Sequence, residues 1–187
     1  MRRTFAIGSI LIAFCCFLLP AAIAETSRQS VTLYGGPATT QYVSHIVQGD
    51  FTVDGGLLGL AYDRQLASLG SGFTLEAEAQ VAHAFMNRSY TTVAAGLGVR
   101  YDTSAWTSQE SSFAFYTGPS YADNIGRTEG HSERFLEYVG LEFALENINN
   151  SQWDGVIRMF HRSGAFGLYG KDTDTGSMLG IGIRRRF

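Results

Sequence analysis

The sequence has very little cysteine. Cys15 and Cys16 are its two cysteines, and both lie close to the start of the chain. The rest of the chain therefore forms no disulfide and offers no thiolate to a metal ion, and we expect neither a metal nor another cofactor. A lipoprotein anchor at either cysteine is disfavoured, because Phe14 is bulky where that processing needs a small residue.

Long apolar runs are also scarce, and one of them stands out. Residues 5–19 are almost entirely apolar, follow two arginines and lead to small residues before Glu25. This pattern predicts a secretory signal peptide over residues 1–24, cleaved before Glu25. No later stretch has the roughly 18 consecutive apolar residues that a membrane helix needs. Residues 25–187 are therefore expected to form one domain that either is soluble or crosses a membrane as a β-barrel.

Basic charge is low as well. The chain has 14 lysines and arginines against 17 acidic residues, and its formal net charge is −3. Two of the arginines fall in the predicted signal peptide, so the remainder is more acidic still. Without a basic patch, nucleic acid is not expected as a partner.

Alternation of apolar and polar residues is abundant, whereas apolar residues rarely recur at helical spacing. In the range 72–85, for example, Leu75 and Val81 lie on one face and Glu76 and Glu78 on the other. Every such segment has one face of large apolar residues and one of glycine, alanine and charge. Eight segments are predicted as strands: 30–36, 55–66, 72–85, 90–103, 111–121, 133–146, 153–163 and 177–187. Pro119 is expected to weaken the upper end of the fifth.

The small and charged face decides the architecture. Alternation alone fits a barrel with either face outward, but three features favour a polar interior. Glycines space the charged residues, the chain ends in the aromatic Phe187, and the charges can pair with one another. The residues expected to pair are Glu76, Glu78, Glu142, Arg100, Arg158 and Arg184. The prediction is an eight-stranded antiparallel transmembrane β-barrel, filled by its own side chains, in the outer membrane of a Gram-negative bacterium.

The lengths of the connections give the barrel a direction. Those after the second, fourth and sixth segments are short, and those after the first, fifth and seventh are longer. The short connection after the third does not fit this division. Outer-membrane barrels have short periplasmic turns and longer extracellular loops, so both ends of the chain are expected on the periplasmic side.

The seventh segment carries an anomaly. Its apolar face runs from Trp153 through Ile157 and Met159, and then continues with His161 and Ser163. Those two side chains are expected to share the lipid-facing side of one strand, roughly 7 Å apart, at the outer membrane interface. An imidazole there can take the proton of the hydroxyl. The simpler interpretation is that both are boundary residues tolerated where water begins, and His83 on the third segment is interpreted in that way.

This pattern resembles a known family. His161-Arg162-Ser163 on the penultimate strand, a loop that begins Gly164-Ala165, a last strand ending in Phe187 and an export signal resemble the PagL family of outer-membrane lipid A deacylases. The resemblance implies an acyloxyacyl hydrolase, an esterase that removes an ester-linked acyl chain from the lipid A of lipopolysaccharide. It makes His161 the base and Ser163 the nucleophile.

Two positions depart from the family's pattern. The family commonly follows its serine with an asparagine that helps the oxyanion site, and this chain has Gly164, which offers only its backbone N–H. The family's orienting glutamate lies at the start of the last strand, and the position here with that parity is Ser177.

The catalytic acid therefore has three candidates. Asp172 and Asp174 precede the last strand. Glu137 lies on the outward face of the sixth segment, where a carboxylate is costly. Folding that hairpin between residues 148 and 149 places Glu137 beside Phe160 and His161.

Two other functions stay open at this point. The first is a small non-enzymatic outer-membrane barrel with a structural or adhesion role. The second is a soluble periplasmic ligand-binding barrel with its polarity reversed. The sequence also leaves open which acyl chain is cut and whether the barrel forms a homodimer.

Overall fold

Eight antiparallel strands make up the structure, which is a computed structural model. It describes residues 27–39, 45, 48–50, 52–87, 89–103, 110–124, 134–148, 151–164 and 174–187, without the side chains of 174–176. The predicted signal peptide lies outside the described residues. The strands are β1 (Gln29–Thr39), β2 (Gly55–Gly70), β3 (Phe73–Phe85), β4 (Tyr90–Asp102), β5 (Ser111–Ala122), β6 (Phe135–Leu145), β7 (Trp153–Ser163) and β8 (Asp174–Arg186).

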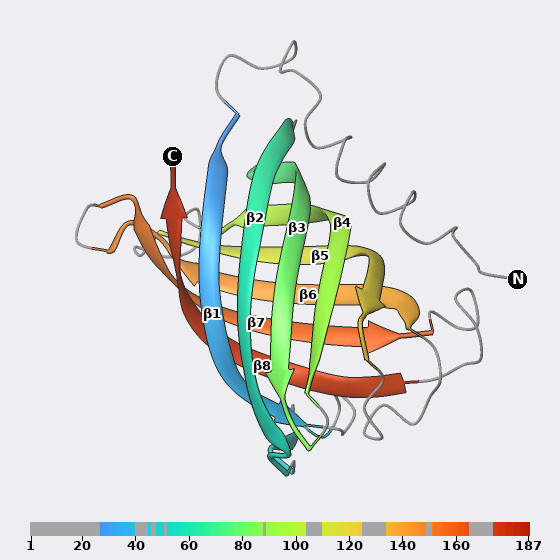
Figure 1. The fold of residues 1–187 in the computed structure, drawn as a ribbon. Helices are drawn as coiled ribbons and strands as arrows, with labels where there is room; N and C mark the ends of the chain where they lie inside the picture. Colours follow the sequence, from blue (N-terminus) through green and yellow to red (C-terminus); the bar gives the residue numbers. More distant parts are fainter. Residues whose placement is uncertain are drawn as a thin grey trace, which may run out of the picture.

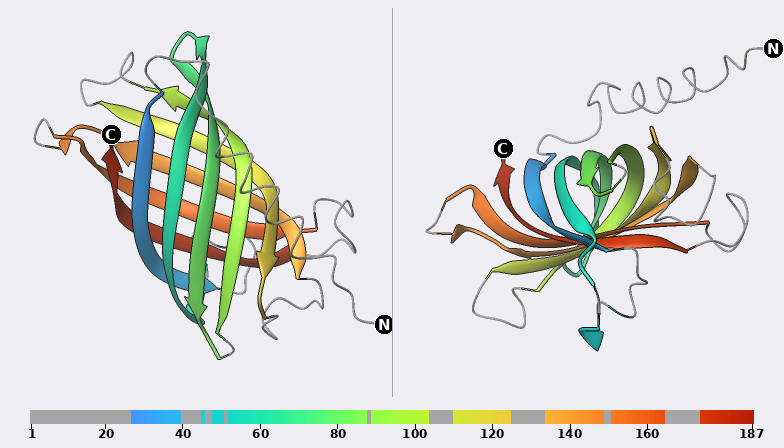
Figure 2. Two further views of the ribbon diagram at one scale, coloured as in Figure 1. Left: turned by 45° about the horizontal axis from the view of Figure 1, so that its top comes forward. Right: turned by 60° about the horizontal axis from the view of Figure 1, so that its bottom comes forward.

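Each strand pairs with its neighbours in the sequence, and β1 pairs with β8 to close the barrel (Figures 1 and 2). Closure gives every strand a partner on both sides, so no unpaired backbone edge faces the surroundings. Within the described residues, no helix is long and apolar enough to span a lipid bilayer.

All eight predicted strands are present, but several boundaries differ from those expected. β1 continues through Pro37 to Thr39, and β2 extends to Gly70. The turn after β2 is tighter than predicted, because Ser71 and Gly72 adopt left-handed backbone angles with φ of 52° and 82°. β5 also continues past Pro119, although Gly118 and Pro119 have no registered partners on β4. Because proline has no backbone N–H, the pairing with β4 is interrupted at this point, but the strand does not end.

The outer surface of the barrel is apolar. Leu97 is 55% exposed and Ile181 is 72% exposed, and similar side chains alternate outward along the other strands. The small and charged set points inward, as predicted. A soluble barrel would bury the large apolar set, so the soluble, reversed-polarity hypothesis is wrong.

A network of ion pairs fills the middle of the barrel. Glu142 lies at its centre, and Arg100, Arg158 and Arg184 each place a guanidinium nitrogen 2.9 Å from one of its carboxylate oxygens. Arg100 also contacts Glu76 at 2.9 Å, and Arg158 contacts Glu78. This confirms the predicted pairing and satisfies charges that would be costly to bury alone.

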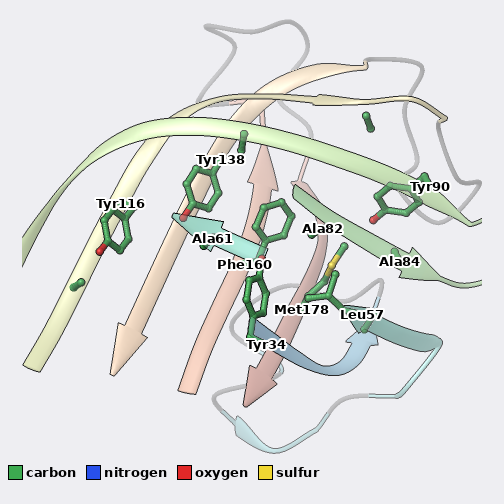
Figure 3. Close-up of a cluster of buried hydrophobic side chains, with 14 residues drawn as sticks. Tyr34, Leu57, Ala61, Ala82, Ala84, Tyr90, Tyr116, Tyr138, Phe160 and Met178 are labelled. Carbon is green, nitrogen blue, oxygen red and sulfur yellow. The ribbon is translucent and has the colours of Figure 1, made fainter. Parts of the chain in front are cut away.

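Tyrosine rings and apolar side chains fill the remaining interior (Figure 3). The ring of Tyr138 stacks on Phe160 at 5.3 Å. Tyr116 lies over Gly98, its partner on β4, in space that a Cβ atom would occupy. Glycine is therefore needed at that position so that a large ring can cross the narrow interior.

The two ends of the barrel can be told apart. The start of β1 and the end of β8 lie side by side, since Ser30 pairs with Arg186. The connections 71–72, 103–110 and 146–152 lie at this end; at the other end lie the longer 40–54, 123–134 and 164–173 and the short 86–89, which is the exception. Short turns identify the first end as periplasmic, so β7 ends at the extracellular side.

Candidate active site

Five polar side chains interrupt the apolar outer surface near the extracellular ends of β5 to β8. They are Thr117, Glu137, His161, Ser163 and Ser177, and together we name them the rim cluster. Strand register brings them together in two adjacent rows. Thr117, His161 and Ser177 share one row, and Glu137 and Ser163 share the next.

His161 lies between Val139 on β6 and Ser177 on β8. Its Nδ1 is 3.1 Å from Oγ of Ser177. Ser177 lies on the outward face of β8 but is fully covered by its neighbours. The strand alternation that places Arg158 and Arg162 inside the barrel turns the imidazole outward, as predicted. The ring is held through Nδ1, the nitrogen that the acid engages in a Ser-His-Asp triad.

Ser163 is two residues further along the same face of β7. Its partner on β6 is Glu137 and its partner on β8 is Asp174. The register between β7 and β8 shifts between His161 and Ser163, which marks a β-bulge at this point. Bulges redirect side chains and are common beside active sites.

Glu137 does not take the place predicted for it. It lies opposite Ser163, three residues beyond Phe160, so the expected hairpin register is wrong. The connection after β6 runs from residue 146 to residue 152, longer than the expected turn, and Asn147 in it has a left-handed φ of 55°. Glu137 is consequently a direct neighbour of the candidate nucleophile and a diagonal neighbour of His161.

The side chain of Glu137 has a defined partner. Oγ1 of Thr117 donates a hydrogen bond to its Oε1. A carboxylate facing lipid is costly, and this bond offsets part of that cost. Thr117 was not predicted as a site residue. Its outward parity on β5, in a segment expected to pair with the one that carries Glu137, is the signal that could have found it.

The other predicted site residues are placed only in part. Asp172 lies outside the described residues, and of Asp174 the structure describes the backbone, which pairs with Ser163. Gly164 directly follows β7 and is buried. The roles of these residues as acid or oxyanion donor stay predictions.

His83 is not part of the rim cluster. It lies on β3, four strands from β7 in either direction around the barrel. Its Nδ1 is 3.0 Å from Oγ1 of Thr91, and its ring packs edge-on against Phe85. It is a second outward histidine in a different setting, which makes it a useful control.

A closed ring of eight strands, an apolar outer surface and an ion-paired interior define an outer-membrane β-barrel. No family model matches the chain, and no curated protein matches it. Among solved structures, it is similar to the outer membrane protein Ail of Yersinia pestis, with a TM-score of 0.49, 10% identity and coverage of 87% of this chain and 100% of that one. It is also similar to the outer membrane protein AlkL, with a TM-score of 0.39, 12% identity and coverage of 90% and 94%. At such low identity neither likeness bears on activity.

Proposed function

We propose that this protein is a lipid A deacylase, an esterase that hydrolyses an ester-linked acyl chain of lipopolysaccharide in the outer leaflet. One observation carries the proposal. On the outward wall near the extracellular end, His161 is held through Nδ1 by Ser177 and shares its strand face with Ser163. The resemblance of His161-Arg162-Ser163 to the PagL family supports the same reaction.

The position of the rim cluster suits a substrate that is itself a membrane lipid. Ion pairs occupy the middle of the lumen, whereas the rim cluster lies on the outside of the barrel. β7 rises roughly 25 Å from Trp153 to Ser163, given about 3.3 Å per residue and a strand tilt near 40°. Ser163 is therefore level with the outer interface, where the acyl esters of an outer-leaflet lipid lie. The substrate needs only lateral diffusion to reach it.

The reaction follows the serine-hydrolase scheme. Oγ of Ser163 attacks the ester carbonyl carbon while His161 takes its proton. The backbone N–H of Gly164 is placed directly after the nucleophile to donate to the oxyanion. Collapse of the intermediate releases the lipid alcohol, which takes the proton from His161, and leaves the acyl chain on Ser163. Water, deprotonated by His161, then attacks the acyl-enzyme; the bond to Oγ of Ser163 breaks, His161 returns the proton to that oxygen, and the fatty acid is released.

In a Ser-His-Asp triad the acid both orients the histidine ring and stabilises its protonated form. In this proposal Ser177 has the first role and Glu137 the second. Ser177 fixes the imidazole ring, and Glu137 supplies negative charge beside Ser163 and diagonal to His161. A nearby carboxylate favours the imidazolium that forms when Ser163 loses its proton.

The test is the mass of lipid A from cells that express the wild type, Ser163→Ala or His83→Ala. The wild type and His83→Ala are expected to remove one acyl chain, and Ser163→Ala is expected to leave lipid A intact. Gel mobility before and after heating verifies that each barrel is folded. Equal lipid A masses for folded wild type and Ser163→Ala contradict the proposal and favour a non-enzymatic barrel.

A further inference from the structure

A groove lies on the outer surface at the opposite, periplasmic end of the barrel. It is lined by Val31, Leu33, Trp153, Ile183, Arg185 and Phe187, and its volume is about 540 Å³. That volume is within the range of about 300–1,000 Å³ typical of small-molecule sites. The lining comes from β1, β7 and β8 and their ends, and it is apolar except for one guanidinium.

Strand register explains why the surface is hollow here. Trp153, Arg185 and Val31 form one row across three strands, and Gly155, Ile183 and Leu33 form the next. Glycine provides no side chain on β7 in the second row. A Cβ added there would meet only the Cδ1 atom of Ile148, at 3.3 Å. The gap above Trp153 thus results from a missing side chain between larger neighbours.

Arg185 is the unusual member of this lining. It lies in a run of three arginines, and alternation turns Arg184 and Arg186 inward, where both reach Asp154. Arg185 faces outward, and among the residues that the structure describes no carboxylate pairs with it. Its guanidinium carbon lies 5.7 Å from the ring centroid of Trp153, a cation–π contact that leaves the N–H donors for an anion.

We propose that this groove binds a phospholipid of the periplasmic leaflet. Its phosphate accepts hydrogen bonds from the Arg185 guanidinium, and one acyl chain runs over Ile183 and Leu33 towards the membrane centre. The positive charge of Arg185 complements the negative charge of a phosphate. Arg185 lies beside Trp153, and interfacial tryptophans lie at the level of the lipid headgroups in a membrane. Arginine is also the side chain best suited to bidentate phosphate contacts. The site is independent of the rim cluster.

The experiment measures lipid retention by the full-length barrel in detergent, using native mass spectrometry with added dimyristoylphosphatidylglycerol. A diacylglycerol with the same chains, which lacks the phosphate, is the comparison lipid. Arg185→Ala is expected to weaken retention of the phospholipid about tenfold, as expected for loss of a charge-assisted hydrogen bond. Retention of the diacylglycerol is expected to be weak and unchanged.

The matched control is Arg64→Ala. Arg64 lies on β2 near the same end of the barrel, pairs with Gln29, and is not part of the groove. Its replacement is expected to leave retention at the wild-type level. A second variant, Ile183→Trp, fills the groove and is expected to lower retention while keeping Arg185. Equal retention by the wild type and Arg185→Ala overturns the proposal, and so does an equal loss in Arg64→Ala, which points to surface charge alone.

Discussion

Oγ of Ser177 lies 3.1 Å from Nδ1 of His161, across the pairing of β7 with β8. A neutral hydroxyl therefore occupies the position at which a Ser-His-Asp triad has a carboxylate. The hydroxyl can fix the orientation of the imidazole ring, but it provides no charge to stabilise an imidazolium.

The first prediction concerns this contact. Ser177→Ala removes the hydrogen bond to the ring and is expected to lower kcat for lipid A deacylation about tenfold, with KM unchanged. Ser177→Thr keeps the hydroxyl and is expected to retain most of the activity. Initial rates on purified lipopolysaccharide provide the measurement. If threonine is as poor as alanine, the hydroxyl is not the group that matters.

A second prediction separates the candidate acids. Glu137→Gln keeps the shape of the side chain and removes its charge beside Ser163, so kcat is expected to fall at least tenfold. Asp172→Asn and Asp174→Asn are expected to have smaller effects. Thr117→Val is expected to lower the rate less than Glu137→Gln, because it removes only the donor to that carboxylate. A larger loss in either aspartate variant would reassign the acid.

The third prediction concerns the interior. Glu142→Ala leaves Arg100, Arg158 and Arg184 without their shared carboxylate. Breaking a buried ion pair by removing one partner costs about 3–5 kcal/mol, so the free energy of unfolding in detergent is expected to fall by at least that amount. Urea titration read by gel mobility gives the value. Asp50→Asn, at an exposed carboxylate, is the control and is expected to change little.

A fourth prediction uses pH. Glu146 follows β6 at the periplasmic end. Burial by itself raises the pKa of its carboxyl group. The Arg28 guanidinium, hydrogen bonds from Ser112 and Arg28, and the charge of Arg184 outweigh burial and lower this pKa to about 2. A lowered pKa in the folded state means that ionised Glu146 stabilises the barrel above its ordinary pKa of 4.5. This contribution is lost as the pH falls from 4.5 towards 2.

The measurement compares urea midpoints of the wild type and Glu146→Gln at pH 7 and pH 3. The wild type is expected to be more stable by about 1–3 kcal/mol at pH 7, and this difference is expected to shrink at pH 3. A difference that is the same at both pH values would mean that packing, and not charge, is what the glutamine variant loses.

The strands and their polarity could be predicted because they depend on a two-residue period that the sequence shows directly. Glu76, Glu78 and Glu142 recur on the glycine-rich faces together with Arg100 and Arg158, and a narrow interior pairs them. The outward placement of His161 and Ser163 follows from the same parity, and the structure confirms it.

Register across hairpins was harder to predict, because it depends on turn conformation. The β6–β7 connection is longer than expected and contains the left-handed Asn147, and with it Glu137 lies opposite Ser163 instead of Phe160. The bulge between His161 and Ser163 is likewise a local backbone event. Alternation specifies which face of the sheet a side chain takes, but not which residue lies opposite it on the next strand. Whether Glu137 lies close enough to act as the acid is decided by the residue opposite it.

The carboxylate at the centre of the barrel has a consequence for the cell. With Glu142 bound by three guanidiniums and buried tyrosine rings packed into the same interior, side chains fill the middle of the lumen in the part of the chain that the structure describes. We therefore expect the protein to add no open pore to the membrane that holds it.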